Sequence, residues 1–217
     1  MIFWIIPARQ GSKRFKNKNR KLLPYTLDEI PSEIHERTVI TTDDEYIWNH
    51  VSDMDVKLHE RSDRLASDEV SMREVLINVA EDFNFEKTDT FVMLYLTYPG
   101  RSYEDIKSAI NFFQDRGANS LLCRQPVKSH PYLCMHAEEN NKGSQVIDHE
   151  LYRYQDYPEV FELSHYIAIQ KVGEIPNLNP NLYNEDTVYY PVENVIDVDY
   201  KEDFERFLKE NLKRGSY

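Results

Sequence analysis

Residues 2–21 read IFWIIPARQGSKRFKNKNRK and combine an apolar run with a basic segment. The first five residues are apolar without interruption, as in a parallel strand that is covered on both faces. Seven of the thirteen residues from Arg9 to Lys21 are Lys or Arg, and none is acidic. In an open α/β sheet, ligands bind at the carboxyl ends of the strands. A basic segment at that position favours a polyphosphate, which the cations and the backbone N–H groups around Gly11 would hold.

Strand-like and helical segments alternate through the first half of the chain. Apolar strands separated by amphipathic helices are typical of a mostly parallel, twisted sheet with helices on both faces. Ser102 begins a capping box with Asp105, and Gly117 follows the same helix as a stop signal. The sequence therefore predicts an α/β domain. The predicted strands lie at 2–6, 38–42, 55–61, 90–97, 119–127, 165–171 and 194–200, and the predicted helices at 45–51, 67–83, 102–117 and 201–213.

The pattern changes after the strand at 119–127. The segment 127–165 is polar, is interrupted by turn residues and contains no long helical run. It predicts a small excursion from the sheet, built from hairpins, rather than a further unit of strand and helix. We therefore expect one domain over 1–217 that carries this excursion as a small late insertion.

The charge and cysteine content exclude several classes of protein. The chain has 38 acidic and 26 basic residues, a formal net charge of −12, which disfavours nucleic acid and anionic membranes as partners. The apolar start, MIFWIIPA, is too short to span a bilayer and no cleavage site follows, so neither a membrane anchor nor a signal peptide is expected. Cys123 and Cys134, with no CxxC motif, predict two reduced thiols in a cytoplasmic protein.

The basic segment also carries a spaced motif. Ala8-Arg9, Ser12-Lys13 and Lys18-Asn19 follow the first strand, and this arrangement closely resembles the opening of the acylneuraminate cytidylyltransferases. The resemblance covers most of the chain, and it implies the Rossmann-like fold of nucleotide-diphospho-sugar transferases and a site for CTP. It also implies a catalytic role for Arg9, Lys13 and Lys18 on the phosphates. The nucleotide-binding residues that it implies are Ala8, Arg9, Gly11, Ser12, Lys13, Lys18, Asn19, Arg61, Asp68 and Ser71.

Three later stretches resemble the sugar-binding side of the same family. They are LYLTYPGR at 94–101, a His-Pro-Tyr element at 130–132 and the run RYQDYP at 153–158. An arginine in such a run can bind the carboxylate of a sugar acid through two parallel hydrogen bonds. The sugar-binding residues that the resemblance implies are Tyr95, Thr97, Arg101, Lys128, His130, Arg153 and Gln155.

The first of these stretches and a later one, LSHYIAIQ at 163–170, depart from the family pattern. Tyr95 stands where the family has Gln, Tyr98 replaces a Ser, and the family's Asn-Gly-Ala motif is replaced by a stretch containing Ser164 and His165 without glycine. Tyrosine can stack or donate one hydrogen bond, but it cannot repeat the paired contacts of an amide. Such changes are expected in a member with a different sugar-acid substrate, and also in a homologue that has lost activity.

A pair of acidic residues near the end of the chain predicts a metal site. Asp197 and Asp199 lie two positions apart in VIDVDY, so on a strand both carboxylates would point to one face. Mg²⁺ binds one or two carboxylates together with substrate phosphates. The alternative is a pair of exposed turn carboxylates, and the match of VIDVDY to the family favours the metal.

These features predict transfer of CMP from CTP to the anomeric hydroxyl of a sialic-acid-like nonulosonic acid, with Mg²⁺ as cofactor and release of pyrophosphate. The resemblance implies a homodimer, with 127–165 in the contact. Three alternatives stay open: a cytidylyltransferase for another sugar acid such as 3-deoxy-octulosonate, a catalytically silent nucleotide- or sugar-binding homologue, and a nucleic-acid binder. The Ser-Lys and Lys-Asn spacing disfavours the first, the carboxylate pair the second, and the acidic remainder of the chain the third.

Overall fold

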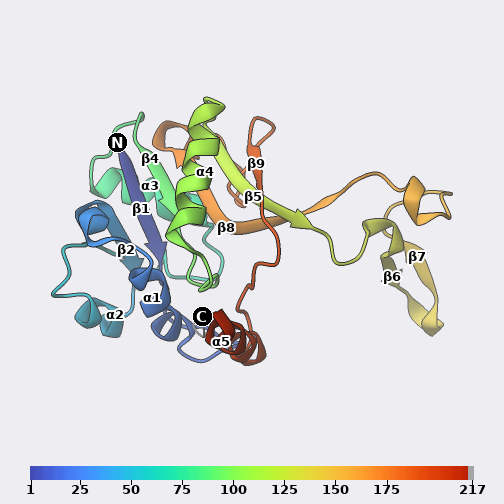
Figure 1. Ribbon diagram of the computed structural model, residues 1–217, viewed down its shortest axis with the longest axis horizontal. Coiled ribbons are helices and arrows are strands. Elements are labelled where there is room, and N and C mark those ends of the chain that lie inside the picture. The colour runs from blue at the N-terminus through green and yellow to red at the C-terminus, as the bar shows by residue number, and fades with distance from the viewer. Residues whose placement is uncertain (215–217) are drawn as a thin grey trace.

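The fold is built on one seven-stranded sheet, as seen in a computed structural model that describes residues 1–214 (Figure 1). The strand order is β3-β2-β1-β4-β8-β5-β9, and β8 runs antiparallel to both of its neighbours while the other pairs are parallel. The predicted α/β fold with a mostly parallel sheet is confirmed. The strands are β1 (Ile2–Pro7), β2 (Thr38–Thr42), β3 (Lys57–Glu60), β4 (Thr90–Met93), β5 (Ser120–Pro126), β8 (Phe161–Lys171) and β9 (Val188–Pro191).

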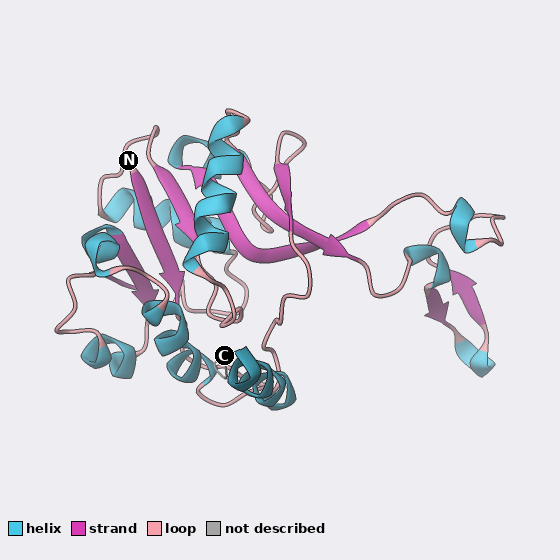
Figure 2. Ribbon diagram, in the orientation of Figure 1, coloured by secondary structure: helices cyan, strands magenta, loops and turns pink. Residues whose placement is uncertain are grey.

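Helices cover both faces of this sheet (Figure 2). Alternate residues of β1 enter two separate cores: Trp4 and Ile6 pack with α1, α4 and α5, whereas Phe3 and Ile5 pack with α3. Burial on both faces explains why the first strand has no polar residue. The helices are α1 (Lys18–Asp28), α2 (Glu45–His50), α3 (Met72–Asp82), α4 (Tyr103–Asp115) and α5 (Lys201–Arg214).

Side-chain caps set where three helices begin. The predicted capping box of Ser102 with Asp105 is present at α4, and Ser71 makes a second one with Glu74 at α3. The cap at Ser71 starts α3 later than the predicted 67–83, because a residue at the N-cap has an extended backbone. Asp44 caps α2 by accepting a hydrogen bond from the backbone of Tyr46.

The predicted strand at 194–200 is wrong. The last strand of the sheet is β9, and residues 192–200 continue from it as a loop. Asn194 has a positive φ of 55°, which interrupts an extended strand. Beyond it, the backbone N–H of Val198 donates to the carbonyl of Thr97, at 2.7 Å, so this segment attaches to the loop that follows β4. The segment therefore reaches the carboxyl edge of the sheet without joining it.

The predicted excursion forms an arm that stands away from the sheet (Figure 1). It contains a hairpin of β6 (Met135–Ala137) and β7 (Gly143–Gln145), joined to the body by β5 and β8. Pro126 pairs with Phe161 at its base, so the last residues of the predicted range 127–165 belong to β8. Stacking of Tyr132 on His149, with ring centroids 4.1 Å apart, helps to hold the arm together. No helix within residues 1–214 is both long and apolar enough to span a membrane.

Candidate functional site

A cavity of about 500 Å³ lies at the carboxyl ends of β1 and β4. The chain leaves β1 at Pro7, and the basic segment up to α1 forms one side of the cavity. Gly11 has a φ of 86°, a left-handed conformation that glycine adopts without steric cost. Residues predicted to bind nucleotide that line this cavity are Arg9, Gly11, Ser12, Lys13, Lys18, Asn19, Arg61 and Asp68.

Two of the predicted catalytic cations share one carboxylate. Arg9 Nη2 and Lys13 Nζ each lie 2.5 Å from an oxygen of Asp68. Hydrogen bonds from Lys13 and Arg9 lower the pKa of Asp68 to about 2. Arg9 also donates through Nη1 to the carbonyl of Ala66, at 2.9 Å. Asp68 is half-exposed, so an incoming phosphate can compete with it for both cations.

The third predicted cation, Lys18, faces a different carboxylate. Its Nζ lies 2.9 Å from Oδ1 of Asp199, and Arg14 approaches Oδ2 of the same residue at 3.2 Å. Lys18 is the first residue of α1, and the hydrogen bond from it is the main cause of a lowered pKa at Asp199. The carboxylate predicted for the metal and the cation predicted for phosphate therefore lie at one point of the cavity wall.

Other members of the basic segment support the loop. Ala8 is buried; its N–H donates to the carbonyl of Thr41 at 2.9 Å, and its carbonyl accepts from the hydroxyl of Thr42 at 2.7 Å. The side-chain amide of Asn19 donates to the carbonyl of Arg9, also at 2.7 Å. Ala8 and Asn19 therefore hold the path of the backbone through the loop.

Two cations of the basic segment that lie outside the motif contact neighbouring elements. Arg20 makes a two-pronged ion pair with Asp44 at 2.8 and 2.9 Å, and Lys21 lies 4.4 Å from the centroid of the Phe15 ring. They contact neighbouring elements because α1 starts inside the basic segment. Among the described residues, Lys16 is exposed and has no hydrogen bond or ion pair.

The two acidic residues predicted to bind metal are close enough to influence each other. Thr97 and Tyr98 lie beside the carboxyl group of Asp197, and each of them acts to lower its pKa. Loss of solvent, reinforced by the negative charge of Asp199, raises the pKa of Asp197. The described residues contain no cluster of three or more His, Cys, Asp or Glu that could hold a metal. Two adjacent carboxylates fit a cation such as Mg²⁺, which takes its other ligands from phosphates and water.

A second hollow of about 460 Å³ adjoins the first at Asp68 and Tyr95. The Tyr95 ring meets the His165 ring edge-on, with centroids 5.5 Å apart. Burial raises the pKa of Tyr95, so its hydroxyl stays protonated and can donate a hydrogen bond. The Tyr98 hydroxyl contacts Ser164 and Asp197. The residues that depart from the sugar-side pattern therefore line or flank one hollow, which Thr97 and Ser71 also line.

Comparison with known sequences assigns this arrangement to a family. The cytidylyltransferase family matches residues 3–210. This chain belongs to the cytidylyltransferase family. It is 24% identical over 212 residues to an N-acylneuraminate cytidylyltransferase of Streptococcus agalactiae, a match that covers 92% of this chain and 51% of that enzyme. Over 123 residues it is 31% identical to the N-acylneuraminate cytidylyltransferase of Escherichia coli, covering 52% of this chain and 28% of that enzyme. The match therefore spans between a quarter and a half of these two relatives.

Relatives of similar length and solved structures extend the family match. A CMP-N,N'-diacetyllegionaminic acid synthase of Legionella pneumophila is 27% identical over 199 residues, covering 86% of this chain and 84% of that enzyme. The structure of a CMP:2-keto-3-deoxy-manno-octonic acid synthetase complexed with CTP matches with a TM-score of 0.67 at 12% identity, over 98% of this chain and 99% of that one. This structural likeness shows that the cytidylyltransferase fold is shared.

The remaining predicted sugar-binding residues lie away from these two hollows. Arg101 is buried and donates to the carbonyls of Tyr166 and Tyr95, at 2.5 and 3.1 Å, so it holds the loop after β4 against β8. The other four residues belong to the arm. Arg153 pairs there with Asp156, and His130 caps a short helical turn. The residues of the arm that are predicted to bind the sugar are Lys128, His130, Arg153 and Gln155.

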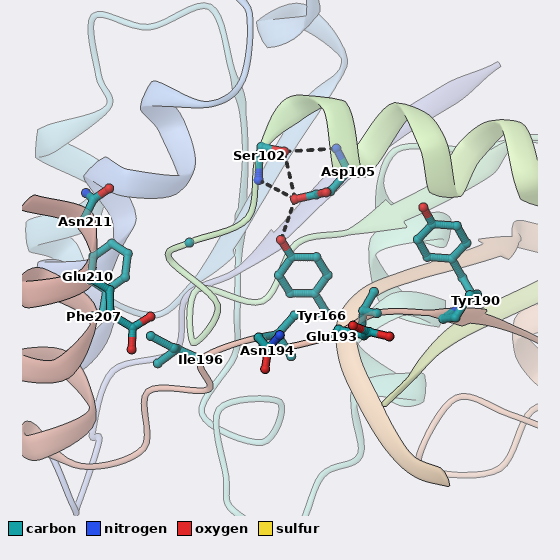
Figure 3. A pocket seen from close by; sticks show the side chains of 14 residues that line it. Ser102, Asp105, Tyr166, Tyr190, Glu193, Asn194, Ile196, Phe207, Glu210 and Asn211 are labelled. Carbon is teal, nitrogen blue, oxygen red and sulfur yellow. Dashed lines mark hydrogen bonds between the residues drawn. The ribbon is translucent and has the colours of Figure 1, made fainter. Parts of the chain in front are cut away.

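Another cavity of similar size lies between α4, α5 and the segment after β9 (Figure 3). The Tyr166 hydroxyl donates to Asp105 at 2.7 Å, and the same carboxylate caps α4. Glu193 and Glu210 also line this cavity, which shares no residue with the one beside the basic segment. Its acidic lining disfavours a triphosphate, whereas the cavity beside the basic segment presents cations to one.

Several residues that shape the site were not predicted. Arg14 contacts Asp199, although Arg14 is not part of the spaced motif. Thr41 and His59 lie behind Arg61, and both are buried. The one sequence signal for this group of residues is His59 in the short strand-like run KLHE, since a polar ring that faces a core requires hydrogen-bond partners.

Proposed function

We propose that this member of the family transfers CMP from CTP to the anomeric hydroxyl of a sialic-acid-like nonulosonic acid and releases pyrophosphate. The observation that carries the proposal is one cavity at the carboxyl edge of the sheet in which Arg9, Lys13 and Lys18 lie opposite acidic partners. A triphosphate has the charge and the number of oxygens to engage these cations at once.

Phosphate binding proceeds by exchange of ion pairs. Asp68 holds Arg9 and Lys13, and Asp199 holds Lys18, so the cations are ordered before the nucleotide arrives. Phosphate oxygens replace these carboxylates and gain charge-assisted hydrogen bonds from groups already in place. The cations then stabilise the charge that moves onto pyrophosphate when the bond to the α-phosphorus breaks.

Asp197 and Asp199 are the residues that would hold Mg²⁺. The ion, when bound, supplies positive charge to the phosphate oxygens and acidifies a coordinated hydroxyl. The chain contributes two carboxylates of unequal basicity, since Asp197 has a raised pKa and Asp199 a lowered one. Thr97 and Tyr98 orient the Asp197 carboxyl group.

The hollow beside Tyr95 is the candidate sugar pocket. Two relatives act on N-acylneuraminate and another is a CMP-N,N'-diacetyllegionaminic acid synthase, so nonulosonic acids are the favoured class. Tyr95, Tyr98 and His165 present hydroxyl and ring surfaces rather than an amide, which favours a sugar acid with apolar substituents. A 3-deoxy-octulosonate substrate and a silent homologue are the alternatives.

The arm is the proposed contact of a homodimer. Its exposed apolar side chains would be buried in such a contact, and its sugar-side residues would then lie near the partner subunit's pocket. The exposed apolar residues of the arm are Leu133, Met135, Val146, Ile147, Leu151, Tyr152 and Tyr154.

Pyrophosphate release tests the enzymatic proposal directly. Purified protein is incubated with CTP, Mg²⁺ and a panel of nonulosonic acids, with 3-deoxy-octulosonate as a comparison. Release with a nonulosonic acid is the expected result, and release with the octulosonate alone would move the substrate to the other branch. A folded protein that binds CTP but releases no pyrophosphate with any sugar would be a silent homologue.

A further inference from the structure

A chain of hydrogen bonds runs from the surface of α3 to the wall of the nucleotide cavity. Nε2 of His59 lies 3.0 Å from Oδ1 of Asn78 and 3.2 Å from a carboxylate oxygen of Asp82. Nδ1 of the same ring lies 2.8 Å from the hydroxyl of Thr41. That hydroxyl in turn accepts a hydrogen bond from Nε of Arg61, at 3.0 Å.

The partners determine the direction of every bond in this chain. Both partners of His59 Nε2 are acceptors and so favour the tautomer that carries its proton on Nε2. Nδ1 is then an acceptor, and the Thr41 hydroxyl donates to it. A hydroxyl that donates its one proton is free to accept, and it accepts from Arg61. The chain is therefore fully ordered, with each group in one role.

Arg61 needs such an anchor because it is a buried cation. It is 5% exposed, and burial lowers its pKa to about 10. Its Nη2 is buried and makes no hydrogen bond to any residue that the structure describes, although Arg61 lines the nucleotide cavity. A buried donor without a partner is costly, and a bound ligand with an acceptor would satisfy it.

We propose that His59 and Thr41 are positioning residues that hold the Arg61 guanidinium in the orientation in which it receives the nucleotide. The inference rests on the proposed function, since it takes CTP as the ligand of this cavity. Rotation about the last bonds of an arginine side chain moves its donors by several ångströms. Fixing Nε leaves the outer edge of the guanidinium plane to the ligand and reduces the entropy that is lost on binding.

The test compares two valines on one strand. Thr38 and Thr41 both lie in β2, both are fully buried, and both use their hydroxyls, but Thr38 donates to the carbonyl of Ile34 instead. We expect T41V to weaken CTP binding about tenfold in titration calorimetry, because the anchor of a charged donor is lost. T41S, which retains the hydroxyl, should bind CTP like the wild type. T38V should leave CTP affinity unchanged even where it lowers the melting temperature.

His59 and a second readout separate positioning from general stability. H59L removes the acceptor for Thr41 and should weaken CTP binding severalfold, whereas H59N retains an acceptor near Nδ1 and should restore it. The Nε–H signal of Arg61 in NMR should be protected from exchange in the wild type and T41S, and exposed in T41V. Equal CTP affinity and equal protection in T41V and the wild type would overturn the inference. A protected signal in a wild-type protein that fails to bind CTP would instead overturn the proposed function.

Discussion

Lys16 and Lys18 are two positions apart in the same basic stretch, and their surroundings differ. Lys18 begins α1 and contacts Asp199 at 2.9 Å, with only 15% of its side chain exposed. Lys16 is exposed and has no ion pair among the described residues. Charge alone does not distinguish them, whereas position in the fold does.

This difference predicts unequal effects of two matched substitutions. K18A should weaken CTP binding about tenfold or more, because solvent and salt screen the charge of a partly buried cation only weakly. K16A removes the same charge from the same stretch and should change the affinity by less than about twofold. Calorimetric titration with CTP at fixed ionic strength measures both. Equal losses in the two variants would show that the stretch acts through its net charge.

The unequal pKa values of the carboxylate pair predict a pH-dependent requirement for Mg²⁺. A proton competes with the cation for Asp197, and the raised pKa of Asp197 brings this competition to a higher pH than an ordinary aspartate shows. Lys18 lowers the pKa of Asp199, so protons compete with the cation for Asp199 only at a lower pH. The Mg²⁺ concentration for half-maximal pyrophosphate release should therefore rise as the pH is lowered, and the rise should begin above the ordinary range of an aspartate.

Excess Mg²⁺ is the control for this competition. Saturating Mg²⁺ should restore most of the activity at the acidic end, because the cation then displaces the proton. A half-maximal concentration that stays constant over the same pH range would show that Asp197 is not a ligand.

At the scale of elements, substitutions in the two capping boxes distinguish an effect on helix stability from an effect on ligand binding. Ser71 caps α3 with Glu74 and also lines the hollow beside Tyr95, whereas Ser102 caps α4 and does not line it. S71A and S102A should each lower the free energy of unfolding by about 1 kcal/mol. Chemical denaturation measures this loss.

The two variants should differ in their response to nucleotide. S71A is expected to weaken CTP binding as well, because Ser71 lines the hollow that adjoins the nucleotide cavity and Met72, the first residue of α3, lines both. S102A should leave CTP binding unchanged. If both variants bind CTP like the wild type, Ser71 has a capping role and the prediction that it binds nucleotide is wrong.

The elements near the end of the chain show why strand prediction failed there. VIDVDY has β-branched residues in alternation, which is the pattern of a strand. A strand also needs a continuously extended backbone, and the positive φ of Asn194 interrupts the extended backbone directly after β9. The segment instead attaches through Val198 to Thr97, which places Asp197 and Asp199 at the site. The metal-site prediction rests on an incorrect element, yet Asp199 lines the cavity beside the basic segment and Asp197 lines the adjoining hollow.

At the scale of the whole molecule, we expect that removal of the arm prevents dimerisation and leaves CTP binding intact. Pro126 and Phe161 pair at the base of the arm, so a short glycine-rich turn can replace residues 127–160 without opening the sheet. The shortened protein should fold, bind CTP like the full chain and sediment as a monomer. Its turnover with a sugar acid should be lost, since the arm carries four of the predicted sugar-side residues.

Analytical ultracentrifugation and calorimetry read out the two expectations independently. A shortened protein that remains a dimer would place the subunit contact on the body of the protein. A shortened protein that turns over sugar as fast as the full chain would assign the sugar site to the two hollows alone. As a control, a charge-reversing substitution at exposed Glu150 should leave assembly intact if the apolar side chains of the arm form the contact.

Local information in the sequence was sufficient for the frame of this protein. The apolar run of β1, the cap at Ser102 and the amphipathic spacing of α4 are each decided by residues within a few positions of one another. The basic segment after the first buried strand therefore indicated both the fold class and the edge of the sheet at which the candidate site lies.

Only the tertiary structure decided which charges and hydrogen-bonding groups meet. Arg9 and Asp68 are 59 positions apart and Lys18 and Asp199 are 181 apart, yet both pairs line one cavity. The chain from His59 through Thr41 to Arg61 likewise depends on β2 lying beside β3. Such contacts follow from the order of strands in the sheet and the path of the loop after β9, and periodicity along the chain carries no information about either.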